Sequence, residues 1–187
     1  GQVLGTAFHA DLTVSFACEK LGTVLFPGSD YAGEVIPVEI GIGTKLFEEN
    51  PEVCYTLEKS DLSKFLPDRK KNSHKGSYGK ILMITGSKGM SGAAYLSARA
   101  AYISGGGLVQ IYTEESNRTI LQQLLPEAIV STYTEYEEEK LQSLLKWADV
   151  ICIGCGLGKS RTAGQILSYL MKYAEVPCVI DADGLNL

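Results

Sequence analysis

Three short segments carry the residues that could do chemistry in this sequence. Each directly follows an apolar run: GSKGMSG at 86–92, GCGLG at 154–158 and DADGLN at 181–186. Glycines let a backbone approach a ligand closely, and a helix that starts after such a loop offers unpaired N–H groups to an anion. Carboxylates and an amide suit a metal–phosphate or another polar ligand. Each segment alone also fits an ordinary capped turn, but the three together indicate a binding cleft.

The middle segment runs into Gly158-Lys159-Ser160, which is how a phosphate-binding P-loop ends. A P-loop also needs a glycine five positions before Gly158, where this sequence has Ile153. The dinucleotide fingerprint G-x-G-x-x-G fails as well, because the third position after Gly156 is Lys159. Neither motif identifies the ligand, so the rest of the chain must do so.

Composition and charge are those of a globular protein without nucleic-acid or membrane partners. The 187 residues are 45% hydrophobic and 21% charged, enough for a sizeable core. A formal net charge of −5 offers no basic field to nucleic acid or to an anionic membrane surface. No apolar run approaches the roughly twenty residues of a membrane span, and the first residues lack a signal-peptide pattern. The odd count of five cysteines, three of them in apolar runs, indicates reduced thiols, and we expect a cytoplasmic protein.

The cysteines, lysines and histidine near these segments also allow plainer interpretations. Cys152 and Cys155 form a C-x-x-C, which suits redox chemistry or half a zinc site. No second pair follows and Cys152 lies inside an apolar run, so we predict reduced core thiols and no metal site. Lys88, Lys159 and His74 either contact a ligand or lie solvated at the surface.

The hydrophobic pattern divides the chain into two parts. Residues 10–16 and 33–40 alternate like half-buried strands, and Ser60 is a plausible N-cap of a short helix stopped by Pro67. From about Gly79 onward, apolar runs alternate with helical patterns. The expected strands are 80–85, 108–112, 128–133, 150–153 and 178–180, and the expected helices are 93–104, 117–125, 137–147 and 162–173. This alternation predicts an α/β fold with a parallel sheet, helices on both faces and ligands beyond the carboxyl ends of the strands.

The order and spacing of these blocks resemble a known family. The runs SHKGSYGKILMITGSKGMSGAAYLSARAAYISGGGLVQIYT, ADVICIGCGLG and VIDADGLNL are similar to the ribokinase-like dehydratase domain of the NAD(P)H-hydrate repair enzymes. The opening part, GTAFHADLTVSFACEKLG through VEIGIG, is similar to the closing strands of the NAD(P)H-hydrate epimerase domain, which is Rossmann-like. The resemblance implies the C-terminal part of an epimerase domain at 1–45, a linker at 46–60 and the first part of a dehydratase domain at 61–187.

The resemblance implies nicotinamide nucleotide repair. The expected reaction is ADP-dependent dehydration of (S)-NAD(P)H-hydrate to NAD(P)H with release of AMP and phosphate, coupled to epimerisation of the R and S hydrates. Phosphorylation makes sense because phosphate leaves far more readily than hydroxide. The implied cofactors are ADP or ATP, Mg²⁺, and K⁺ for the epimerase half, and the implied partners are the small-molecule substrate NADHX or NADPHX and further copies in a homo-oligomer.

Two other functions share the same fold-level features. A ribokinase-like kinase acting on a vitamin or sugar hydroxyl needs a similar glycine-lined cleft, and so does a non-catalytic nucleotide-binding module. The epimerase-like opening favours the repair enzyme over a vitamin kinase.

Carried over position by position, the resemblance implies that Ala93 and Gly156 contact the hydrated nucleotide. Cys155 replaces the proline of the family's usual Gly-Pro-Gly-Leu-Gly, which keeps the glycines but removes a backbone stiffener. Six further positions are expected to line the cleft near the phosphates: Gly89, Gly92, Gly154, Asp181, Asp183 and Asn186. The dehydratase's catalytic Asp is expected beyond Leu187, and the epimerase's catalytic Asp and K⁺ ligands before Gly1. The segment alone is therefore expected to be inactive.

Overall fold

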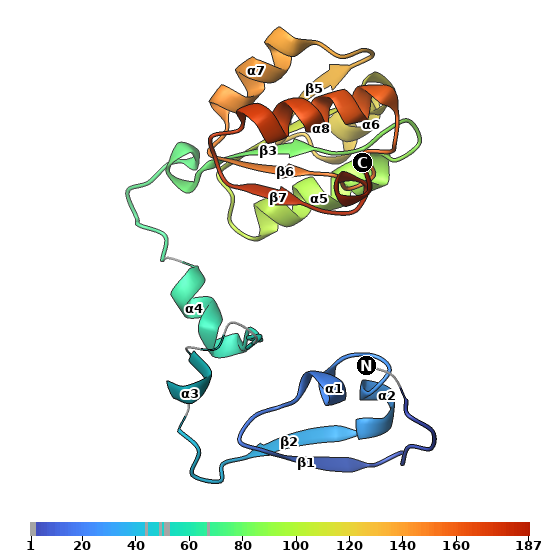
Figure 1. Cartoon of the computed structure of the whole chain (residues 1–187). Helices are drawn as coiled ribbons and strands as arrows, with labels where there is room; N and C mark the ends of the chain where they lie inside the picture. Colours follow the sequence, from blue (N-terminus) through green and yellow to red (C-terminus); the bar gives the residue numbers. More distant parts are fainter. Residues whose placement is uncertain (1–2, 44, 49, 51–52, 67) are drawn as a thin grey trace. The chain divides into compact units, whose positions relative to one another are not determined.

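The chain divides into two compact units, Gly1–Pro67 and Asp68–Leu187. The computed structural model describes residues 3–43, 45–48, 50, 53–66 and 68–187 (Figure 1). Positions 49, 51 and 52 of the expected linker, and Pro67, the expected helix stop, lie outside these residues.

The first unit contains a pair of parallel strands. β1 (Leu12–Phe16) and β2 (Glu34–Val38) pair in register, so that Val14 lies opposite Ile36. These are the strands predicted within 10–16 and 33–40. Two single helical turns, α1 (Leu21–Val24) and α2 (Ser29–Ala32), lie between them in the chain.

The end of the first unit holds further short helices. They are α3 (Lys45–Glu48), the 3₁₀ helix η1 (Lys59–Asp61) and α4 (Leu62–Phe65). The sequence predicted that Ser60 caps the short helix before Pro67. This prediction is wrong, because Ser60 lies within η1. The cap is formed instead by Glu58, whose backbone N–H donates to the Asp61 carboxylate at 3.0 Å.

The second unit is built around a five-stranded parallel sheet in the order β5-β4-β3-β6-β7 (Figure 1). Its strands are β3 (Lys80–Ile84), β4 (Leu108–Glu114), β5 (Ile129–Tyr133), β6 (Val150–Ile153) and β7 (Cys178–Ile180). Its helices are η2 (Lys75–Tyr78), α5 (Ser91–Ile103), η3 (Glu115–Asn117), α6 (Arg118–Leu124), α7 (Glu138–Trp147), α8 (Arg161–Tyr173) and α9 (Asp183–Asn186). Every strand and helix predicted for this part is confirmed, and the α/β fold with it.

Both faces of this sheet are buried, which explains the uninterrupted apolar runs. Leu82 and Ile84 of β3 pack in the cluster that contains the buried faces of α7 and α8. Met83, between them in sequence, packs in the opposite cluster with Ala94 of α5. Successive side chains of a strand point to opposite faces, so each residue of β3 contributes to one core or the other. Burying one such side chain stabilises the fold by about 1.5–3 kcal/mol.

The helices of the described residues include none that is long and apolar enough to span a membrane.

Candidate substrate site

The three segments singled out in the sequence meet at the carboxyl edge of β3, β6 and β7. We call residues 86–92, 154–158 and 181–186 the glycine-loop cluster. Backbone hydrogen bonds join the first two loops, from Gly86 N–H to the Cys155 carbonyl at 3.0 Å and from Ser87 N–H to the Gly156 carbonyl at 2.6 Å. The Asp183 carboxylate joins the third loop to the second by accepting from Gly158 N–H at 2.8 Å. The parallel sheet thus brings together loops that are far apart in sequence.

Ala93 and Gly156, the two positions expected to contact substrate, lie against each other. A Cβ atom added to Gly156 would sit 2.6 Å from the Ala93 Cβ and 3.2 Å from the Met90 Cβ. Gly156 also has a φ of +62°, which a residue with a side chain adopts only with strain. Gly156 is buried and Ala93 is partly buried, and their contact leaves no room for a larger side chain at position 156.

The other glycines of the cluster have different surroundings. Gly154 is buried at φ +123°, and a Cβ there would lie 1.8 Å from the Asp181 carbonyl oxygen. Gly89 and Gly92 are exposed, and an added Cβ at either would meet no atom within 4 Å among the described residues. The lack of a side chain at Gly154 therefore lets the second and third loops pack closely. Gly89 borders open space just before α5, and Gly92 borders open space in its first turn.

The polar side chains of the third loop are not equivalent. One oxygen of Asp183 is occupied by Gly158 N–H, and the Asn186 amide donates to the Ala182 carbonyl at 2.9 Å within α9. The Asp181 carboxylate is exposed at the end of β7. Within the part of the chain that the structure describes, no three His, Cys, Asp or Glu side chains cluster as metal ligands.

Two buried residues that sequence reasoning missed support the first loop. The Thr113 hydroxyl, at the end of β4, donates to the Gly86 carbonyl at 2.8 Å. The Asn117 amide donates to the Ser87 carbonyl at 3.0 Å and to the Thr113 hydroxyl oxygen at 2.9 Å. A polar residue at the end of a strand predicts only that the strand ends there, so the sequence carried no sign of this contact.

The cysteines, His74, Lys88 and Lys159 are the other side chains that the sequence singled out. All five cysteines, each within the described ranges, are free thiols. Burial, together with the neighbouring Cys155, raises the pKa of the Cys152 thiol to about 11, which leaves almost no thiolate at neutral pH. His74 is exposed and caps η2, and Lys88 and Lys159 are exposed.

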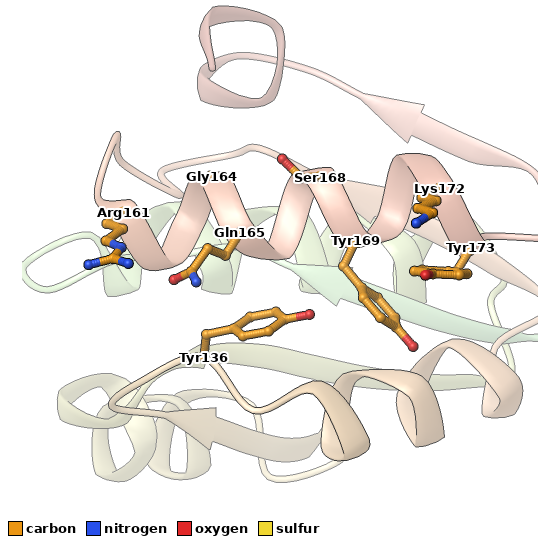
Figure 2. Close-up of a pocket in the computed structure, with 8 residues that line it drawn as sticks. All are labelled: Tyr136, Arg161, Gly164, Gln165, Ser168, Tyr169, Lys172 and Tyr173. Atoms are coloured by element: carbon orange, nitrogen blue, oxygen red, sulfur yellow. The ribbon is translucent and has the colours of Figure 1, made fainter.

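A groove of about 460 Å³ lies elsewhere on the second unit, between α8 and Tyr136 (Figure 2). We call it the tyrosine groove. It is lined by Tyr136, Arg161, Gly164, Gln165, Ser168, Tyr169, Lys172 and Tyr173. The ring of Tyr169 lies 6.3 Å from that of Tyr136 and 4.5 Å from that of Tyr173, measured between centroids. The groove shares no residue with the glycine-loop cluster.

The sheet order and the loops at its carboxyl edge are those of a doubly wound α/β protein, and similar solved structures assign it to the ribokinase-like class. A ribokinase-like superfamily protein from Enterococcus faecalis superposes with a TM-score of 0.64 at 32% identity, covering 72% of this chain and 49% of that chain. The ADP/ATP-dependent NAD(P)H-hydrate dehydratase from Bacillus subtilis, co-crystallised with ATP/Mg²⁺, superposes with a TM-score of 0.54 at 32% identity, covering 64% of this chain and 43% of that chain.

The sequence comparisons narrow this class to one family. The sequence model of NAD(P)H-hydrate dehydratase matches residues 81–187, more than half of the chain. The chain belongs to the NAD(P)H-hydrate dehydratase family, which confirms the family predicted from the sequence.

Individual relatives match more of the chain than residues 81–187. The bifunctional NAD(P)H-hydrate repair enzyme of Coxiella burnetii is 37% identical over 187 residues, which is all of this chain and 38% of that protein. The ADP-dependent (S)-NAD(P)H-hydrate dehydratase of Lactiplantibacillus plantarum is 41% identical over 128 residues, or 67% of this chain and 45% of that protein. The chain therefore spans less than half the length of these relatives, and the bifunctional relative matches its first unit as well.

Proposed function

We propose that the protein containing this chain is an ADP-dependent (S)-NAD(P)H-hydrate dehydratase that restores NADH or NADPH and releases AMP and phosphate. The observation that carries the proposal is the contact between Ala93 and Gly156 at the carboxyl edge of the sheet. Both positions match those that hold the hydrated nucleotide in the family that the sequence resembles. A surface of one Cβ and one glycine backbone suits the flat face of a nicotinamide ring.

The start of α5 is suited to the phosphate part of this chemistry. This helix of 13 residues begins at Ser91, at the end of the first glycine loop, and has no acidic residue in its first turn. No side chain of the described residues caps it, whereas α8, which follows the second loop, is capped by the Ser160 hydroxyl accepting from Ala163 N–H. The uncapped N–H groups of α5 are left to bind an anion such as a nucleotide phosphate.

The reaction requires a good leaving group on the hydrated ring. Transfer of the β-phosphoryl group of ADP to the ring hydroxyl, which loses its proton, releases AMP and replaces hydroxide by phosphate as the leaving group. The ring nitrogen lone pair then expels phosphate, and loss of a proton from the neighbouring ring carbon restores the dihydronicotinamide. Donors fixed by the fold, such as the N–H groups at the start of α5, stabilise the negative charge on the transferring group without reorganising.

The acidic residues present fit a Mg²⁺ ion that is shared with the nucleotide rather than caged by protein. Mg²⁺ at phosphate sites is commonly held by one or two carboxylates together with phosphate oxygens. Asp181 is exposed at the end of β7 and would provide such a carboxylate, while Asp183 already accepts from Gly158 N–H. When bound, the ion would neutralise charge on the phosphates.

The first unit belongs, in this proposal, to the epimerase half of a bifunctional enzyme, with K⁺ as its ion. The match of the bifunctional Coxiella burnetii relative to the whole chain supports this assignment. A cytoplasmic homo-oligomer is part of the same proposal and rests on the family resemblance.

The proposed function is tested by measuring repair of NADH hydrate by the full-length protein. We expect the ultraviolet absorbance of the dihydronicotinamide ring to return only when ADP is present, with one AMP and one phosphate released per ring restored. Gly156→Ala should abolish recovery, and Gly164→Ala, the same change in the tyrosine groove, should retain it. Phosphate found stably attached to a small alcohol, without ring recovery, would contradict the proposal in favour of a kinase.

A further inference from the structure

A buried polar pair connects β4 and the start of α6 to the glycine-loop cluster. Thr113 is 0% exposed and Asn117 is 1% exposed, so neither side chain can reach bulk water. Among the described residues, their side-chain hydrogen bonds stay within the pair or go to the backbone of the first loop, at Gly86 and Ser87. Buried polar groups are costly unless they are paired, so this arrangement holds the loop in one position.

The same loop residues hold the substrate surface. Gly86 and Ser87 use their carbonyls to accept from Thr113 and Asn117, and they use their N–H groups to bond Cys155 and Gly156. A continuous chain of hydrogen bonds therefore runs from the Asn117 amide, through Ser87, to the Gly156 carbonyl. The pair touches neither Ala93 nor Gly156 through these bonds, yet it determines where the Gly156 backbone is held.

We propose that Thr113 and Asn117 are positioning residues, which hold the Gly86-Ser87 segment so that Gly156 and Ala93 form the surface for the hydrated nicotinamide. This inference rests on the proposed function for the role of that surface. A displacement of about 1 Å in the segment that holds this surface would weaken its packing against the hydrated ring, so residues remote from the ligand can control the KM.

A matched control lies at the end of the neighbouring strand. Thr85 is also 0% exposed, but its hydroxyl has no hydrogen-bond partner among the described residues. Thr113→Val and Thr85→Val are the same near-isosteric change in the same kind of environment. Only Thr113→Val removes a donor from the Gly86 carbonyl and an acceptor from the Asn117 amide.

The kinetic experiment separates positioning from a loss of folded protein. In the protein as encoded, we expect Thr113→Val to raise the KM for NADH hydrate about tenfold or more, Thr113→Ser to restore it, and Thr85→Val to leave it unchanged. Asn117→Ala should act in the same direction as Thr113→Val. A purely structural role would lower kcat through a smaller folded fraction and leave the KM of the remaining enzyme unchanged, and that result would overturn the proposal.

Hydrogen exchange tests the positioning step without any activity. We expect Thr113→Val to speed exchange at the amides of Gly86 and Ser87, and Thr85→Val not to do so. If the unmodified protein repairs no hydrate, the proposed function fails, while accelerated exchange would still show that the pair holds the loop. Unchanged exchange in Thr113→Val would overturn the inference even in an active enzyme.

Discussion

Two surfaces of the second unit invite comparison as ligand sites, the tyrosine groove and the glycine-loop cluster. The groove offers a volume of about 460 Å³ and three aromatic rings. Its charged lining residues are two cations, Arg161 and Lys172. The cluster offers few side chains, but its backbone is tightly constrained. The family match and the contact between Ala93 and Gly156 favour the cluster, so hollow volume is the poorer guide to function here.

The physical difference between the two surfaces lies in what their glycines do. Gly154, Gly156 and Gly158 all have positive φ angles. An added Cβ at Gly154 or Gly156 would overlap a neighbouring atom, whereas one at Gly164 in the groove would meet nothing within 4 Å among the described residues. Strained backbone is kept where the surrounding structure requires it, and such positions concentrate at functional sites. The same glycine-to-alanine change should therefore have opposite effects on the two surfaces.

The largest effect is expected for Gly154→Ala. The new Cβ would lie 1.8 Å from the Asp181 carbonyl oxygen, and the φ of +123° is unfavourable for alanine. Backbone on both sides of the contact must move, so we expect a loss of about 3 kcal/mol or more in the free energy of unfolding. Denaturant unfolding of the protein as encoded measures this value. An unchanged transition midpoint would show that the two loops do not pack as described.

Gly156→Ala should have the next largest effect on stability and remove activity. Its Cβ would approach the Ala93 Cβ to 2.6 Å, and we expect a cost of about 1–3 kcal/mol. Ala93→Gly removes the opposing atom, so the double variant should be more stable than the sum of the two single changes predicts. Unfolding measurements on all four proteins complete this cycle. Strict additivity would mean that the two positions are not in contact.

The strands of the second unit could be predicted because each is a short apolar run bounded by glycines or polar residues, and the central strands β3, β4 and β6 are covered on both faces. The end of β4 could not be predicted from the sequence. Thr113 and Glu114 are polar, but they continue the strand because they pair with Thr132 and Tyr133 of β5. Pairing partners that lie elsewhere in the chain leave no local pattern, and the four-residue helices α1 and α2 are too short to show a helical period.

The candidate site could be predicted only in part. Its three loops follow from the rule that ligands lie beyond the carboxyl ends of parallel strands. The specific assignment of Ala93 and Gly156 came from the family resemblance, and their contact depends on the fold. Thr113 and Asn117 were missed because their partners Gly86 and Ser87 lie 27 and 30 residues earlier in the chain. Buried polar contacts of this kind require coordinates.

Asp183→Ala should have a smaller effect than the glycine changes in the cluster. It removes the acceptor of Gly158 N–H, a bond of 2.8 Å between partly buried groups, at a cost of about 1–2 kcal/mol. Asp183→Asn keeps an acceptor oxygen and should lose less stability. Comparing the two variants by thermal unfolding isolates the hydrogen bond. Equal losses would mean that the charge of Asp183, rather than its bond to Gly158, holds the third loop.

The smallest effect, and the one with opposite sign, is expected for Gly164→Ala in the tyrosine groove. Gly164 lies within α8, where its N–H donates to the Ser160 carbonyl at 3.0 Å. An added Cβ would have no atom within 4 Å among the described residues outside the helix's own backbone. Alanine restricts the unfolded chain and favours the helix, which should stabilise the protein by about 0.5 kcal/mol and raise Tm by about 1–2 °C. Repair activity should not change, because the groove has no part in the proposed site. If Gly164→Ala instead lowered kcat/KM as strongly as Gly156→Ala, the groove would be part of the substrate path, and the contrast between the two surfaces would be wrong.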